Sequence, residues 1–253
     1  MSLSGKQFIA GAILAMGIAL SNAGQAFAAS LTSRATLTAD NHYGLFHGSS
    51  TGDRLNFVGR NEYGPNGSTG GYNWSHAETW DFTMDSNDYL YVVVWDDRSV
   101  DESWVGEFSF KDKDSKTYNL LSKPDAWEYV ITQKGTNPGD WGHTPGNAEL
   151  NWEISNANWI SARSRGLNDG STRPWGRISE VTQAAEFLNT TTNSSGDKRD
   201  NNRYTIFRTK LTVADVTDMP PAESVPEPAS AAGLLALGAV GAYSARKRKA
   251  KAE

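Results

Sequence analysis

Apolar and polar residues alternate one by one along much of the middle of the chain. Residues 80–84 and 104–110 show the pattern clearly, with aromatic residues on one side and Asp, Thr, Glu or Ser on the other. Because successive side chains of a β-strand point to opposite faces of its sheet, this period of two predicts half-buried strands. Further strands are predicted at residues 35–38, 43–46, 55–58, 127–131 and 204–213.

One predicted strand departs from this alternation. Residues 89–95, Tyr-Leu-Tyr-Val-Val-Val-Trp, are apolar at every position. Continuous apolar runs are typical of strands that are buried on both faces. We therefore expect this segment to be a central strand with protein packed on each side of its sheet.

Turn-forming residues separate the predicted strands, for example Gly-Pro-Asn-Gly at 64–67 and Asn-Pro-Gly at 137–139. Many short strands at this spacing predict an all-β fold, an antiparallel β-sandwich or jelly roll. One short helix is predicted at residues 178–188, where apolar residues recur at helical spacing. The buried face of that helix would consist of Ile178, Val181, Ala185 and Leu188.

The N-terminus has the pattern of a secretory signal peptide. A single lysine precedes a continuous apolar run of 13 residues, 8–20, and Ala26 and Ala28 are the small residues of a cleavage site. The run is shorter than the about 20 residues that a helix needs to span a bilayer, which argues against a permanent anchor. We expect signal peptidase to cut between Ala28 and Ala29 after export.

The C-terminus combines a short motif, an apolar segment and a basic end. The motif consists of Val225, Pro226, Glu227 and Pro228. Residues 229–245 follow as 17 mostly small and apolar residues, near the lower limit of about 17–25 for a membrane-spanning helix. The basic cluster behind them consists of Arg246, Lys247, Arg248 and Lys249. The positive-inside rule keeps such a cluster in the cytoplasm, so this tail would hold the body at the inner membrane transiently.

This arrangement resembles the PEP-CTERM sorting signal of Gram-negative bacteria. The resemblance rests on Pro226-Glu227-Pro228, the apolar segment and the basic cluster, and it is confined to the end of the chain. In that family an exosortase recognises the motif, cleaves near it, and releases or transfers the protein to the cell surface or the exopolysaccharide matrix. The resemblance therefore implies a processing partner and a location, and it implies no activity for the body.

These signals divide the chain into four parts. Residues 1–28 are the signal peptide, with its helix, and 29–218 are the β-sandwich body. Residues 219–228 are a proline-rich stalk with the sorting motif, and 229–253 are the membrane helix with its basic tail.

The body is acidic and free of cysteine. From residue 29 to residue 225 the chain holds 18 Lys and Arg against 27 Asp and Glu, a net charge of −9. Nucleic acid as a partner would require a basic face, so we exclude it. Without disulfides, an exported body has to be held together by its core or by bound ions.

Three tryptophans, Trp74, Trp141 and Trp175, lie among Gly, Pro and Asn residues outside the predicted strands. A tryptophan exposed on a loop presents a flat apolar face to a sugar ring, so these are candidate glycan-binding residues. The alternative is that each ring caps the sandwich, since tryptophan is usually well buried. Residues 38–46 and 91–97 also resemble the pattern of galactose-binding-like jelly rolls, and that resemblance implies a sandwich and points to carbohydrate.

Acidic residues gather directly after the apolar strand. Asp96, Asp97 and Asp101 are candidate oxygen ligands for a hard cation such as calcium, and a solvated acidic loop is the alternative. The sequence contains many acids but no spacing that singles out the two carboxylates of a glycosidase. We therefore assign no catalytic residue and no cofactor apart from this candidate calcium.

Together these patterns predict a non-enzymatic, exported cell-surface or extracellular-matrix protein, with exopolysaccharide as its candidate ligand. One alternative is a secreted carbohydrate-active hydrolase. The other is a purely structural matrix or coat component without a ligand.

Overall fold

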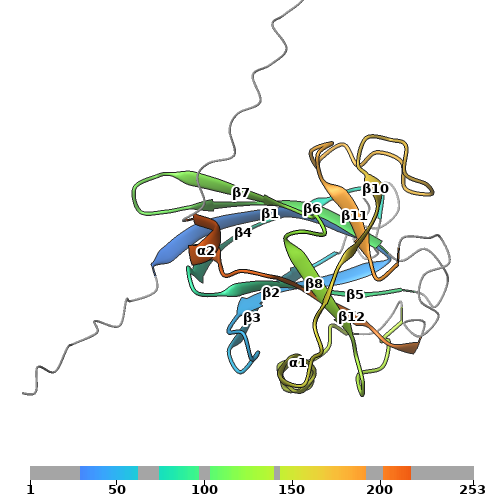
Figure 1. Ribbon diagram of the computed structural model, residues 1–253, viewed down its shortest axis with the longest axis horizontal. Helices are drawn as coiled ribbons and strands as arrows, with labels where there is room; N and C mark the ends of the chain where they lie inside the picture. The colour runs from blue at the N-terminus through green and yellow to red at the C-terminus, as the bar shows by residue number, and fades with distance from the viewer. Residues whose placement is uncertain (1–28, 62–73, 97–102, 140–142, 192–201, 218–253) are drawn as a thin grey trace, which may run out of the picture.

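Two antiparallel β-sheets are stacked face to face (Figure 1). The structure, a computed structural model, describes residues 29–61, 74–96, 103–139, 143–191 and 202–217. The predicted signal peptide, the sorting motif and the apolar tail lie outside these ranges. Within them, no helix is long and apolar enough to cross a membrane. The predicted all-β sandwich is confirmed.

Each sheet has six strands. The first follows the order β10-β11-β6-β1-β4, with β7 also paired to β6, and the second follows β3-β2-β5-β12-β8-β9. The first sheet consists of β1 (Ser30–Asp40), β4 (Glu78–Asp85), β6 (Ser103–Lys111), β7 (Thr117–Leu121), β10 (Arg163–Leu167) and β11 (Glu186–Asn189). The second consists of β2 (His42–Gly48), β3 (Leu55–Arg60), β5 (Tyr89–Trp95), β8 (Trp127–Ile131), β9 (Ile160–Ser161) and β12 (Thr205–Thr209).

The central core fills the space between the two sheets. At its middle, Trp104 from the first sheet meets Trp127 from the second edge to face, with ring centroids 4.7 Å apart. Phe108 and Phe207 pack around this pair, and all four rings are buried. Aromatic pairs in this geometry add about 0.5–1.5 kcal/mol each beyond the area that they bury, so they stabilise the stacking of the two sheets.

Strand β5 is buried on both sides, as its unbroken apolar sequence predicted. Leu90, Val92 and Val94 point into the central core. The alternate residues of the strand point to the outer side of the second sheet, where α1 (Asn147–Ser155) packs with Leu150 and Ile154. This second cluster is called the helix-side core. The helix escaped prediction because these two positions, one helical turn apart, are too few to produce a clear helical period.

A third cluster, the loop-side core, covers part of the outer face of the first sheet. Val105 and Phe187 of that sheet pack there against Trp175, Ile178 and Val181. The helix predicted at 178–188 is therefore wrong, because this stretch is turns followed by strand β11.

The side chain of Asn168 explains the irregular path of this stretch. Its amide nitrogen donates to the carbonyls of Ile178 and Val181 at 2.9 and 2.8 Å, and its oxygen accepts the N–H of Ile178 at 2.7 Å. Asn168 itself is fully buried. The two carbonyls, which a helix would have paired internally, are bonded to this one side chain, so the stretch forms a loop despite its helical spacing of apolar residues.

The strand predicted at 204–213 is also too long. Strand β12 ends at Thr209, Leu211 is 41% exposed, and α2 (Val213–Thr217) begins two residues later. The start of β1 and helix α2 lie at the same end of the sandwich (Figure 1).

Candidate functional site

The outer face of the first sheet is only partly covered by the loop-side core. On the remaining part, strands β4, β1, β6 and β7 pair in register, so their outward side chains form three rows across the sheet. The rows are Thr83, Thr32, Lys111 and Thr117, then Asp81, Arg34, Ser109 and Asn119, and finally Thr79, Thr36, Glu107 and Leu121. All of these residues except Leu121 are polar, and we call the set the polar face.

The polar face follows from the period of two in its strands. In β1, Leu31, Ala35 and Leu37 are buried in the central core, whereas Thr32 and Arg34 point outward and are exposed. Antiparallel pairing aligns these outward positions with those of the neighbouring strands. The result is an open surface in which half of the twelve row positions carry hydroxyl groups and four carry charges.

An ion pair crosses the middle row of the polar face. The Nε and Nη2 of Arg34 donate to the two carboxylate oxygens of Asp81 at 2.7 and 3.0 Å, which is the bidentate geometry of a strong pair. Hydrogen bonding from Arg34 holds the pKa of Asp81 below its usual value, so this carboxylate stays ionised. Both side chains remain about three-fifths exposed, at 60% and 64%, and are therefore open to a ligand.

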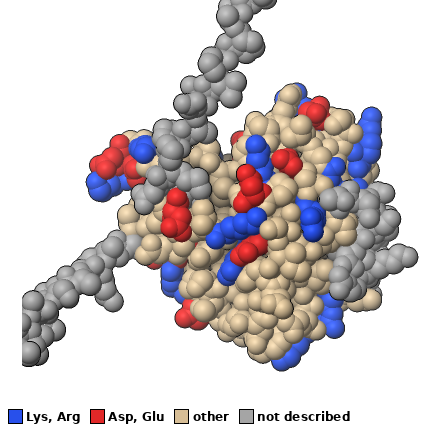
Figure 2. All heavy atoms as spheres, viewed as in Figure 1, with Lys and Arg blue, Asp and Glu red and all other residues tan. Residues whose placement is uncertain are grey.

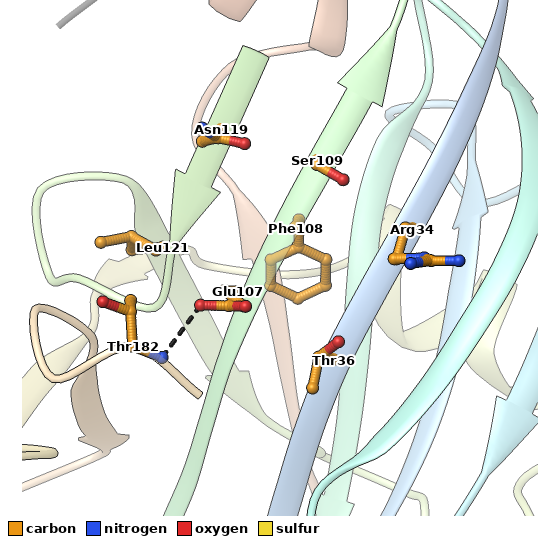
Figure 3. A pocket seen from close by; sticks show the side chains of 8 residues that line it. All are labelled: Arg34, Thr36, Glu107, Phe108, Ser109, Asn119, Leu121 and Thr182. Atoms are coloured by element: carbon orange, nitrogen blue, oxygen red, sulfur yellow. Dashed lines mark hydrogen bonds between the residues drawn. The ribbon is translucent and has the colours of Figure 1, made fainter. Parts of the chain in front are cut away.

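The same surface is hollowed between β1, β6 and β7. The hollow has a volume of about 430 Å³ and is lined by Arg34, Thr36, Glu107, Phe108, Ser109, Asn119, Leu121 and Thr182 (Figure 3). Ligand pockets in proteins usually measure about 300–1,000 Å³. Phe108 itself is buried in the central core, so the side chains that a ligand could reach are polar apart from Leu121.

One wall of the hollow comes from the loop that carries the loop-side core. The carboxylate of Glu107 accepts the backbone N–H of Thr182 at 2.9 Å, an interaction drawn in Figure 3. The Thr36 hydroxyl lies 3.0 Å from that of Thr79 on the neighbouring strand. These contacts hold the wall and the floor in place without occupying the space between them.

Trp175, one of the three candidate glycan-binding residues, is only 5% exposed. Its ring stacks on Phe187 with centroids 5.1 Å apart, and its Nε1 donates to Asp40 Oδ2 at 2.8 Å. The structure therefore places it as a cap on the first sheet, as the alternative interpretation expected. Its ring has no free face to offer to a sugar.

Trp74 is half-buried and packs against the loop-side core. Its backbone carbonyl accepts the hydroxyl of Thr38 at 3.0 Å, which ties this turn to β1. Trp141 lies outside the described residues. The predicted group of three sugar-stacking tryptophans is thus not brought together by the part of the chain that the structure describes.

Asp96 of the candidate calcium site is almost fully buried, with 1% exposed. Its Oδ1 accepts the side-chain amide of Asn137 at 2.7 Å, which links the end of β5 to the loop after β8. Asp97 and Asp101 lie outside the described residues, so the predicted calcium site stays a prediction. Among the described residues, no cluster of three His, Cys, Asp or Glu is arranged to hold a metal ion.

The pentapeptide at 48–52, Gly-Ser-Ser-Thr-Gly, has the spacing of a hydrolase nucleophile elbow. It forms the hairpin turn between β2 and β3, whereas that elbow joins a strand to a helix. Nearby, His47 Nδ1 lies 2.6 Å from Asp88 Oδ2, but Ser49 donates to Asp53 and no hydroxyl of the turn bonds to His47. Within the described residues the turn is therefore not part of a catalytic triad.

Charged side chains of both signs are interspersed over the visible side of the body, and neither sign covers a broad area there (Figure 2). The polar face holds two positive side chains, Arg34 and Lys111, and two negative ones, Asp81 and Glu107, so its charges balance. A surface of this kind can exchange hydrogen bonds with a neutral polar ligand. It offers no extended field to attract a polyanion.

The polar face was not recognised in the sequence because its members come from four strands. Each strand shows the alternation, but the sequence does not say which strands are neighbours. The signal that could have drawn attention to it is the repeated threonine at outward positions of residues 32–36 and 79–83.

Comparison with known proteins assigns the C-terminal segment. The family model of the PEP-CTERM protein-sorting motif matches residues 224–249, which include the proline motif, the apolar segment and the basic cluster. The match confirms the resemblance found in the sequence. The chain matches no curated protein and no solved structure at a significant level, so the resemblance to galactose-binding-like jelly rolls remains a prediction.

Proposed function

We propose that this exported protein, whose PEP-CTERM motif makes it an exosortase substrate, is a non-enzymatic component of the cell surface or extracellular matrix that binds polysaccharide. The sorting motif carries the first half of the proposal, because it implies recognition by an exosortase and export through the membrane. The cell-surface or matrix destination is what the resemblance to the sorting family implies, and the polysaccharide ligand rests on the body.

The observation that supports a polysaccharide ligand is the open, hydroxyl-rich polar face with its hollow. Sugars present hydroxyl groups that both donate and accept hydrogen bonds. Ser109, Asn119 and the Arg34–Asp81 pair supply both kinds of partner within the middle row of the face. An exported protein that meets an exopolysaccharide matrix would find its ligand there at high local concentration.

Binding without turnover fits the carboxylates of this surface better than hydrolysis does. Glycoside hydrolysis requires one carboxylic acid with a raised pKa beside a second carboxylate. At the polar face, the pKa of Asp81 is shifted downward by its hydrogen bonds from Arg34, which is the wrong direction for a general acid. The other carboxylate, that of Glu107, holds the N–H of Thr182.

A glycan array with the exported protein tests the proposal, combined with an assay for released reducing sugar. Retention of a polysaccharide without sugar release is the expected result. Release of sugar would instead favour the secreted hydrolase. Failure to retain any polysaccharide would leave the structural matrix or coat component as the better interpretation.

The sorting half is tested by the intact mass of protein recovered from the cell surface or the medium. We expect this material to lack residues 1–28, after signal peptidase cleavage, and most of the chain after Val225. Surface material that still carries residues 246–253 would contradict processing by an exosortase. The two halves of the proposal are therefore tested by separate measurements.

A further inference from the structure

We propose that the polar face binds a neutral polysaccharide chain that lies across strands β7, β6, β1 and β4, with Arg34, Asp81, Ser109 and Asn119 as its contact row. The inference rests on the proposed function and adds the site, the direction of the chain and the class of polymer. It moves the site from the three tryptophans to a sheet surface that the sequence did not identify.

The direction of the chain follows from the register of the strands. Arg34 lies opposite Asp81 on one side and Ser109 on the other, and Ser109 lies opposite Asn119. Neighbouring strands are about 4.8 Å apart, so the row spans about 14 Å across the sheet. An extended polymer laid along this row meets a new polar side chain at every strand.

The Arg34–Asp81 pair supplies both halves of a hydroxyl contact at one fixed place. A guanidinium has five N–H donors, and two of those of Arg34 are used by Asp81. The remaining N–H groups and the outer lone pairs of the carboxylate point away from the pair. Because each side chain already holds the other in place, a ligand loses little side-chain entropy when it binds them.

The hollow can hold part of the polysaccharide chain at the β6–β7 end of the row. Asn119 and Ser109 border it, Leu121 and the aliphatic parts of the polar side chains give it apolar surface, and Thr182 forms its wall (Figure 3). Sugar rings have apolar C–H faces as well as hydroxyls, so a hollow in which apolar surface lies beside hydrogen-bonding groups matches their surface. The hydrogen bond from the Thr182 N–H to the carboxylate of Glu107 holds this wall in place.

The charges determine the class of polymer. The polar face holds two positive and two negative side chains, Arg34 and Lys111 against Asp81 and Glu107, so it is neutral as a whole. The body around it carries a net charge of −9. An acidic polymer such as a uronate chain would meet no surplus of positive charge here and would be repelled at longer range. A neutral polymer avoids that cost.

The experiment measures binding of the exported protein to two neutral probes, dextran and cellohexaose, and to two acidic ones, alginate and hyaluronan. Affinity electrophoresis serves the polymers, and calorimetry serves the oligosaccharide. Arg34→Gln and Asn119→Ala are the test variants. Arg163→Gln and Asn158→Ala are matched controls, since both are exposed and neither belongs to the polar face.

We expect binding to at least one neutral probe, with each test variant about tenfold weaker, because each removes a hydrogen-bonding group worth roughly that factor. The controls should bind as the parent does. All four variants should melt close to the parent, because their side chains are exposed. Affinity for the neutral probe should also change little between low and high salt, since no ion pair forms with it.

The possible failures are distinguishable. If the parent binds a neutral probe and both test variants bind equally well, the polar face is not the site, although the proposed function stands. If alginate or hyaluronan binds more tightly than the neutral probes, the polymer class is wrong. If no probe is retained by the parent, both this inference and the proposed polysaccharide binding are overturned.

Discussion

Glu153→Gln should destabilise the body although it changes only one atom of a side chain. Glu153 lies on α1, and only 1% of it is exposed. Its two carboxylate oxygens accept the backbone N–H groups of Gln133, Lys134 and Gly135, each at 2.8 Å. This single side chain therefore binds the loop after β8 to the helix that covers the second sheet.

The size of the effect follows from what an amide can accept. Glutamine has one acceptor oxygen, so at least one of the three N–H groups must face an NH₂ group and lose its partner. A hydrogen bond to a charged group contributes about 1.5–3 kcal/mol, and the two bonds that remain are weakened because the acceptor is no longer charged. We expect the free energy of unfolding to fall by about 3 kcal/mol.

The assay is urea unfolding followed by tryptophan fluorescence, on the body from residue 29 to residue 225. Glu149→Gln is the matched control on the same helix, where the carboxylate is exposed and, among the described residues, accepts only the hydroxyl of Tyr204 at 2.8 Å. A glutamine oxygen can keep that single bond but loses the charge that strengthens it, so the control should change stability by about 1 kcal/mol or less, well below the loss expected for Glu153→Gln. A loss below about 1 kcal/mol for Glu153→Gln, with an unchanged m-value, would refute the reasoning.

Three other predictions concern the cap, the acid stability and the sorting. Trp175→Ala should lower the free energy of unfolding by about 3 kcal/mol in urea titration, because this ring is buried, whereas an exposed sugar platform would leave stability unchanged. Burial opposes ionisation of Asp88, but hydrogen bonds from His47 and Arg54 outweigh it and lower its pKa. The stabilisation by ionised Asp88 is thus present above about pH 4 and lost as the pH falls further. In thermal melts, Asp88→Asn should therefore lower the melting temperature clearly at pH 7 and by less in acid. An equal loss at both pH values would contradict a stabilising role for the ionised carboxylate. Replacing both prolines of the sorting motif with alanine should leave the chain in the inner-membrane fraction, and normal release to the surface would argue against recognition of the motif.

The sequence by itself determined the features that depend on a local pattern. The unbroken apolar run at 89–95 identified the doubly covered strand β5, because burial on both faces leaves no polar position in the period of two. The sorting motif was equally readable, since an exosortase recognises a short linear segment and its flanking composition. Neither feature requires knowledge of which segments are neighbours in space.

The same local pattern misled where partners distant in sequence decide the outcome. The apolar residues at 178–188 have helical spacing, but the side chain of Asn168 binds their backbone and holds them as turns. Trp175 lies among loop residues in the sequence, but its ring is buried against Val105 and Phe187, and it donates to Asp40, which is 135 positions away. A tertiary hydrogen bond overrides local spacing because a buried polar group left unpaired costs more than a weak helical preference gains.

Only the tertiary structure decided the polar face. Arg34 and Asp81 are 47 positions apart, and the strands of Ser109 and Asn119 join them through antiparallel register. The sequence showed that each strand has a polar side. Alternation within a strand does not depend on which strands lie next to it, so it cannot reveal the order of the strands. Which polar sides meet is fixed by the pairing of β4, β1, β6 and β7. The burial of Trp104, Trp127 and their neighbours between the two sheets stabilises that arrangement.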